Sequence, residues 1–372
     1  MHMADALISP AVGCTMWAVT ASLIGYCSKK VKSEMDDQKV PLMGVLGAFI
    51  FAAQMINFTI PVTGSSGHLG GGMILSILLG PHIAFLTMAS VLTVQSLFFA
   101  DGGLLALGCN IFNLGFFPCF IAYPLIYKNI VNKVYTQPYS NQNQQKKDKY
   151  ILTGALIASI VGLQMGSFAV VLETLLSRIS ELPFTTFMLM MQPIHLAIGV
   201  VEGVTTAAVV LFIWKARPEI LDSALSTSSL SNSKLNSNST SLSIRNVVIG
   251  VALATILTGG ILSWFASSNP DGLEWAMFKT SGVEELKTQE GLHTSLSEIQ
   301  DKIAFLPDYG FKSNELSESN KSSENPNLVD SGSNMVNAGT SVSGLVGGTL
   351  TLIFTIMIGF TLKRRKSKIT IS

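Results

Sequence analysis

The chain has 372 residues, of which 48% are hydrophobic and only 13% charged, and its mean hydropathy is +0.46. Soluble domains carry about 25% charged residues, so this composition indicates an integral membrane protein. The 24 basic and 23 acidic residues nearly cancel, which leaves no global basic field for nucleic acid.

Nine apolar stretches follow one another along the chain. They cover residues 10–28, 41–60, 70–81, 82–100, 103–127, 151–176, 190–214, 246–266 and 342–362. The third is short and glycine-rich, and counting it as a separate span places every lysine- and arginine-rich loop on one side. By the positive-inside rule that side is cytoplasmic. We therefore expect an all-α, multi-pass protein of the cell membrane with an extracytoplasmic N-terminus and a cytoplasmic C-terminus.

A polar linker divides the chain into two blocks. Residues 218–244 are rich in Ser and Asn and cannot build a core, so they predict a cytoplasmic linker. The preceding block, 1–217, is a predicted seven-helix bundle. The following block, 245–372, is a two-helix unit with a long extracytoplasmic loop at 267–341. That loop is acidic and polar, and we expect its His293 to be solvated.

The chain begins MHMADALISP, which places His2 directly after Met1. A free α-amine has a pKa near 7.7–8.0 and is a good nitrogen donor. The amine, the His2 amide nitrogen and the His2 imidazole can close fused five- and six-membered chelate rings, so three nitrogens lie in one plane. One more imidazole would complete a square-planar set, which suits Ni(II) or Cu(II) better than tetrahedral Zn(II).

The fourth donor predicted from the sequence is His68. It lies in PVTGSSGHLGGG, residues 61–72, between two spans on the same face as Met1. Glycine allows close backbone approach, and irregular backbone at membrane depth occurs where it is buried in protein or lines a cavity. A second-position histidine and a glycine-rich turn are each weak signals. Their occurrence on one side of the membrane favours a metal site.

Five segments carry a family resemblance: MHMADALISP, FAAQMINFTIPVTGSSGHLGGG, LGPHIAF, FFADGGLLALGCNIFNLG and PIHLAIGVVEG. Over about residues 1–215 they resemble the substrate-binding (S) component, the M subunit, of nickel/cobalt energy-coupling-factor (ECF) transporters. SNPDGLEWA, residues 268–276, resembles the PDGLE segment of the small N subunit of nickel-type systems. The resemblance therefore implies a fused M–N protein.

The resemblance also implies a site and partners. The family's ligands are the Met1 amine, the His2 amide and imidazole, and the SGHL histidine, here His68. Its partners are a coupling transmembrane subunit and two cytoplasmic ATPases. Nickel is the implied transported substrate, with cobalt for corrinoid synthesis as the alternative. The family start usually reads MHIPDGFLSP, and Met3, Ala4 and Ala6 depart from it.

Other polar residues in or beside the spans allow two interpretations. Asn57 and Ser66 are predicted to support the site by holding the N-terminal segment and orienting His68, or else to be interhelical hydrogen-bonding groups. His195 and Glu202 are seven residues apart and share a helical face, which predicts a buried polar pair or a contact with coupling subunits.

Two other classes of function compete with transport. The chain contains no Walker A, HExxH or GxSxG motif, so ATP hydrolysis is expected from partner chains. An intramembrane metalloenzyme would need an open water position and a general base, which a closed planar site does not offer. A membrane metal sensor using the acidic loop is the remaining alternative.

Overall fold

The structure is a computed structural model that describes residues 2–34, 39–135, 141–180, 182–217, 220–221, 244–283, 291–311 and 332–369. Met1 and nearly all of the predicted linker 218–244 lie outside these residues.

Long apolar helices dominate the architecture, which confirms the predicted all-α membrane fold. Within the described residues, six helical segments are long and apolar enough to cross a bilayer. Five of them are α1 (Pro10–Glu34), α4 (Pro81–Phe99), α7 (Asn141–Ser177), α8 (Phe184–Ala216) and α13 (Gly332–Ile369). The sixth is one continuous helical segment made of α5 (Leu107–Ile111), η2 (Phe112–Tyr127) and α6 (Lys128–Tyr135). Two shorter apolar helices, α2 (Lys39–Gln54) and α10 (Ile244–Gly260), accompany them.

The third predicted span is a helix but is too short to cross a membrane by itself. It forms α3 (Gly72–Leu79), whose eight residues extend only about 12 Å against a hydrocarbon core of about 30 Å. Gly80 ends it with φ 81° and ψ 160°, a conformation that favours glycine, and Pro81 starts α4 at a position where proline fits well.

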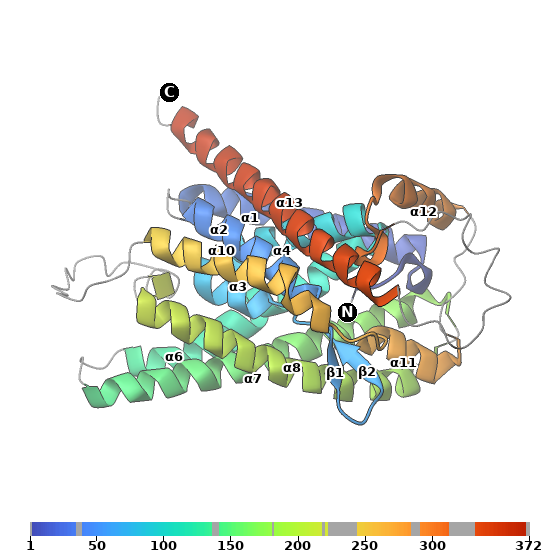
Figure 1. Cartoon of the computed structure of the whole chain (residues 1–372), viewed down its shortest axis with the longest axis horizontal. Coiled ribbons are helices and arrows are strands. Elements are labelled where there is room, and N and C mark those ends of the chain that lie inside the picture. The colour runs from blue at the N-terminus through green and yellow to red at the C-terminus, as the bar shows by residue number, and fades with distance from the viewer. Residues whose placement is uncertain are drawn as a thin grey trace.

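The two ends of the bundle differ in what they carry (Figure 1). The N-terminal end of the described chain, the β1–β2 hairpin, α11 and α12 gather at one end, and the C-terminal end of α13 lies at the other. The hairpin pairs β1 (Phe58–Ile60) with β2 (Ser65–Gly67) in antiparallel register. The structure also contains short 3₁₀ turns: η1 (Asp5–Leu7), η3 (Leu262–Phe265) and η4 (Pro307–Tyr309).

The C-terminal helices pack directly on the first block. α13 lies along α2, and glycines allow the close approach: a side chain at Gly347 would overlap the Phe51 ring, and one at Gly44 would overlap Ile356. α10 and α13 cross where Gly259 meets Gly344. Small residues are typical of close helix crossings in membranes.

Two helices follow α10 on the hairpin side. α11 (Gly272–Ser281) begins with a capping box in which Asp271 Oδ1 accepts from the Glu274 N–H at 2.8 Å and the Glu274 carboxylate accepts from the Asp271 N–H at 3.0 Å. α12 (Leu292–Ile303) follows after a gap in the described residues.

Candidate metal site

The N-terminal segment folds inward and is held by Asn110 of α5. The Met3 N–H donates to Asn110 Oδ1 at 2.8 Å, and Asn110 Nδ2 donates back to the Met3 carbonyl at 3.2 Å. The Gly103 N–H also donates to that carbonyl, at 2.9 Å. Two residues further along the chain, Asp5 Oδ1 accepts from the Ala106 N–H at 2.9 Å. These bonds fix the backbone immediately after His2.

The structure brings the two predicted imidazoles together. The ring centroids of His2 and His68 are 4.9 Å apart, and their planes are 16° from parallel. Both side chains are buried, with 6% of His2 and 7% of His68 exposed. Burial lowers the pKa of each imidazole to about 3, so both are neutral near pH 7 and able to act as nitrogen donors.

The hydrogen bond of His68 shows which of its ring nitrogens carries the proton. His68 Nδ1 lies 3.1 Å from the Leu69 carbonyl oxygen, which can only accept, so Nδ1 carries the proton and Nε2 the lone pair. His2 Nδ1 lies 3.2 Å from Asp101 Oδ1. No hydrogen-bond partner of His2 Nε2 is found in the described part of the chain.

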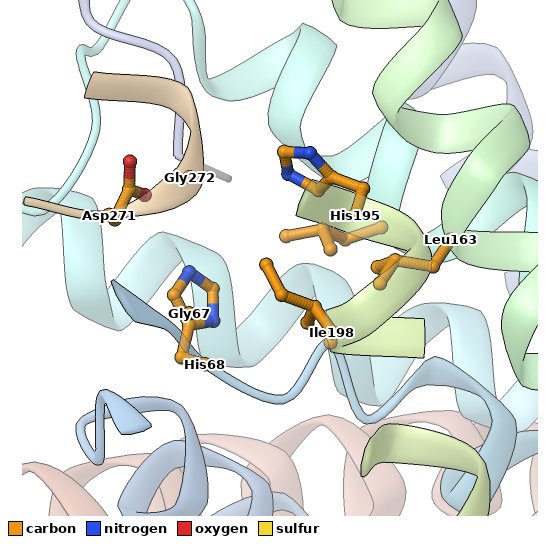
Figure 2. Close-up of a pocket in the computed structure, with 9 residues that line it drawn as sticks. Gly67, His68, Leu163, His195, Ile198, Asp271 and Gly272 are labelled. Carbon is orange, nitrogen blue, oxygen red and sulfur yellow. The ribbon is translucent and has the colours of Figure 1, made fainter. Parts of the chain in front are cut away.

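A small cavity of about 10 Å³, roughly one water molecule, adjoins His68. Figure 2 shows His68, His195 and Ile198, and Asp271 at the start of α11, arranged around this space. The complete lining is Gly67, His68, Gly70, Leu114, Leu163, His195, Ile198, Asp271 and Gly272. The PDGLE segment therefore lies directly against the loop that carries His68.

Asn57 and Ser66 hydrogen-bond with the PDGLE region. Ser66 donates its N–H to the Pro270 carbonyl and its hydroxyl to the Asn269 carbonyl, both at 2.8 Å. The Asn57 carbonyl accepts from the Ser267 N–H at 2.7 Å. Their hydrogen bonds thus join the hairpin to residues 267–270, and the N-terminal segment is held by Asn110 instead.

His195 and Glu202 are both buried but do not bond to each other. His195 Nδ1 donates to the Met191 carbonyl at 2.8 Å, within its own helix. The Glu202 carboxylate accepts the N–H groups of Gly70 and Gly71 at 3.0 and 3.2 Å. The prediction that both side chains are buried is confirmed, but they do not pair with each other, and Glu202 contacts the His68 loop.

Residues 291–311 of the second block also reach the site. The prediction that His293 is solvated is wrong: it is 1% exposed, and its Nε2 donates to the Ile8 carbonyl at 2.9 Å. Gln300 Nε2 donates to the Gly102 carbonyl at 2.8 Å, and the Tyr309 hydroxyl donates to Asp101 Oδ2 at 2.5 Å. Sequence reasoning missed these contacts because no local signal links a polar loop to segments 198 to 285 residues away.

The described residues supply three of the four predicted donors, the His2 amide nitrogen and the His2 and His68 imidazoles, since Met1 lies outside them. Within those residues no group of three or more His, Cys, Asp or Glu side chains is arranged to hold a metal ion. The predicted donor set is of a different kind, because it combines the two imidazoles with one backbone and one terminal nitrogen.

Fold and site together define a multi-pass membrane protein with a buried pair of neutral imidazoles near its N-terminus. A family model described as the cobalt uptake substrate-specific transmembrane region matches residues 2–220, and a PDGLE domain model matches residues 245–364. The chain belongs to this cobalt-uptake family and joins it to a PDGLE domain, which confirms the resemblance to fused M and N components.

Relatives in sequence agree with this assignment. A protein of Haloquadratum walsbyi named for metal transport is 33% identical over 231 residues, 62% of this chain and 98% of the relative. A protein of Archaeoglobus fulgidus named for fused nickel transport, NikMN, is 32% identical over 222 residues, 60% of this chain and 68% of the relative. A crystal structure of a transition metal transporter is 28% identical in sequence. The match covers 58% of this chain and 93% of the transporter's chain, with a TM-score of 0.49. The chain is a membrane protein of nickel/cobalt transport, a transporter component and not a catalytic enzyme.

Proposed function

We propose that the chain is the substrate-specificity subunit of an ECF-type importer and binds Ni(II) in a square-planar site of four nitrogens. The donors are the Met1 amine, the His2 amide nitrogen, His2 Nδ1 and His68 Nε2. The first three belong to one chelate, so the His68 nitrogen fills the one remaining position of the plane. His68 Nε2 already carries a lone pair, because Nδ1 is bonded to Leu69.

The separation of the two rings is the observation that carries this proposal. In such a site the two imidazole nitrogens are neighbours at a right angle. With metal–nitrogen bonds of about 2 Å, the ring centroids would then lie about 4.5 Å apart. The centroids of His2 and His68 are 4.9 Å apart, and their planes are nearly parallel. The two rings are therefore close enough for one ion to reach a nitrogen of each.

One adjustment of His2 is required. Its Nδ1, the nitrogen that closes the six-membered chelate ring, faces Asp101 at 3.2 Å. A half turn about the Cβ–Cγ bond exchanges Nδ1 with Cδ2 and leaves the ring plane and centroid almost unchanged. Metal binding therefore replaces the contact with Asp101 without moving the backbone that Asn110 holds.

Nickel is the preferred ion in this proposal. A deprotonated amide among four planar nitrogens favours low-spin Ni(II), and square-planar geometry is typical of Ni(II) and Cu(II). Uptake of Co(II) for corrinoid synthesis is the alternative, since the matching family model is described by cobalt uptake. A membrane metal sensor is the remaining alternative.

The proposed assembly contains a coupling transmembrane subunit and two cytoplasmic ATPases. The site end of the bundle faces outward, and the basic end with the C-terminus faces the cytoplasm. Residues 1–217 supply every ligand. Residues 245–372 serve loading or coupling, and their contacts with the His68 loop and Asp101 support that role.

Calorimetry on purified protein tests the ligand assignment. His2→Ala and His68→Ala should each abolish high-affinity Ni(II) binding, because each opens one of four positions. His82→Ala is the matched control, since this histidine packs against Tyr26 and Phe120, away from the site, and should bind as wild type. Unchanged affinity in either ligand variant would refute the assignment.

A further inference from the structure

A buried carboxylate on α8 hydrogen-bonds to the loop that carries His68. Glu202 is 2% exposed and lies within a helix of spanning length. Ionisable groups at membrane depth are costly and are kept where they have partners and a role. The two carboxylate oxygens accept the N–H groups of Gly70 and Gly71 at 3.0 and 3.2 Å.

These two N–H groups precede the first turn of α3. The first N–H groups of a helix have no partner within it, and a negative charge is favourable there. Gly71, the residue before α3, has φ 76°, which favours glycine. Glu202 therefore holds the two residues before α3 from another helix and fixes the path of the chain between His68 and α3.

A single peptide group links Glu202 to the His68 ring. The Leu69 carbonyl accepts from His68 Nδ1 at 3.1 Å, and the Gly70 N–H of the same peptide donates to Glu202 at 3.0 Å. A peptide group is planar and rigid. Its carbonyl cannot tilt without its N–H also moving, so the carboxylate on α8 determines where the acceptor of His68 lies.

We propose that Glu202 is the positioning residue for His68, acting through the Leu69–Gly70 peptide to hold Nε2 toward the metal. This inference rests on the proposed metal site. Glu202 packs tightly against Gly70, because a Cβ at Gly70 would lie 2.9 Å from Glu202 Oε2. Gly70→Ala therefore displaces the same carboxylate from the opposite side.

Nickel titration of full-length protein in detergent tests this role. Loss of a partner that orients a metal ligand typically weakens binding by about 10–100-fold. Glu202→Gln keeps one acceptor and should bind roughly tenfold more weakly, whereas Glu202→Ala should approach a hundredfold loss. The visible absorption of the planar Ni(II) complex should shift or broaden in both variants, a change that a purely structural role would not produce.

Controls separate positioning from stability. Thr206→Val removes another buried polar group one turn further along α8, where Thr206 bonds to Ser159 and not to the loop. It should leave nickel affinity and the absorption band unchanged. Gly70→Ala combined with Glu202→Ala should cost less than the sum of the single changes, because both act on one contact.

The outcomes distinguish this inference from the proposed site. Wild-type affinity and spectrum in Glu202→Gln and Gly70→Ala, while His68→Ala abolishes binding, would overturn the positioning role and leave the site intact. Binding by His68→Ala at wild-type affinity would overturn both. If Glu202→Ala does not fold, the Gln and Gly70 variants decide the question.

Discussion

The Tyr309 hydroxyl donates to Asp101 Oδ2 and joins two residues 208 positions apart in the chain. The other oxygen of the same carboxylate faces His2 Nδ1 at 3.2 Å. The C-terminal block thus reaches one proposed ligand through one intermediate side chain. The PDGLE segment lies against the loop of the other, His68.

Tyr309→Phe should destabilise the protein. The ring keeps its packing against Phe99, with centroids 5.3 Å apart, but Asp101 Oδ2 loses its donor. An acceptor left without a partner costs about 1–3 kcal/mol when buried, and the loss here should lie at the lower end, because 22% of the Asp101 side chain is exposed. Thermal unfolding should show the loss, and hydrogen exchange should rise at residues 101–103. Tyr150→Phe, an exposed control, should change neither property, and equal behaviour of the two variants would contradict this account.

Asn110 should be essential for holding the N-terminal segment. Asn110→Ala removes both bonds to Met3, and it leaves the Met3 N–H without its present acceptor. Because these bonds fix the residue after His2, nickel affinity should fall by about 10–100-fold. Asn110→Asp keeps the acceptor for Met3 and should lose less. Calorimetry showing the same affinity for Ala, Asp and wild type would mean that the segment is held by other contacts.

Stability of the metal-free protein should depend on pH through the two imidazoles. Burial lowers the pKa of His2 and His68 to about 3 from 6.5, so below pH 6.5 the unfolded chain binds more protons than the folded one. Their contribution is complete above pH 6.5 and is lost as the pH falls toward 3. Each histidine can contribute up to about 1.4 kcal/mol per pH unit in that range.

The variant His68→Gln isolates one of these two contributions. Glutamine does not titrate, so unfolding measured from pH 7 to 4 should have a shallower slope than in wild type. The difference should correspond to one proton. An unchanged slope would show that His68 is not buried as a neutral group in the folded protein.

The sequence predicted the proximity of His2 and His68 because both lie at the same end of adjacent elements. It could not assign Asn110 or Glu202 a role, since each bonds to backbone groups whose positions depend on helix packing. His293 appears polar in its local sequence, yet it is buried because α12 folds back over Ile8. The apolar run 70–81 predicts a span, but Gly80 and Pro81 end α3 after eight residues, so this helix is too short to cross a membrane by itself.

A nickel titration with the N-terminus extended by one residue tests the central claim most directly. An added residue turns the Met1 amine into an amide and moves His2 out of its chelate position. The protein that starts at Met1 should bind one Ni(II) with the visible absorption of a planar nitrogen complex, and an extension after Ser372 should leave this binding unchanged. The N-terminally extended protein should lose both the high affinity and the band. Wild-type affinity and band in that protein, with the extra residue shown by mass spectrometry to be still attached, would contradict the proposed site.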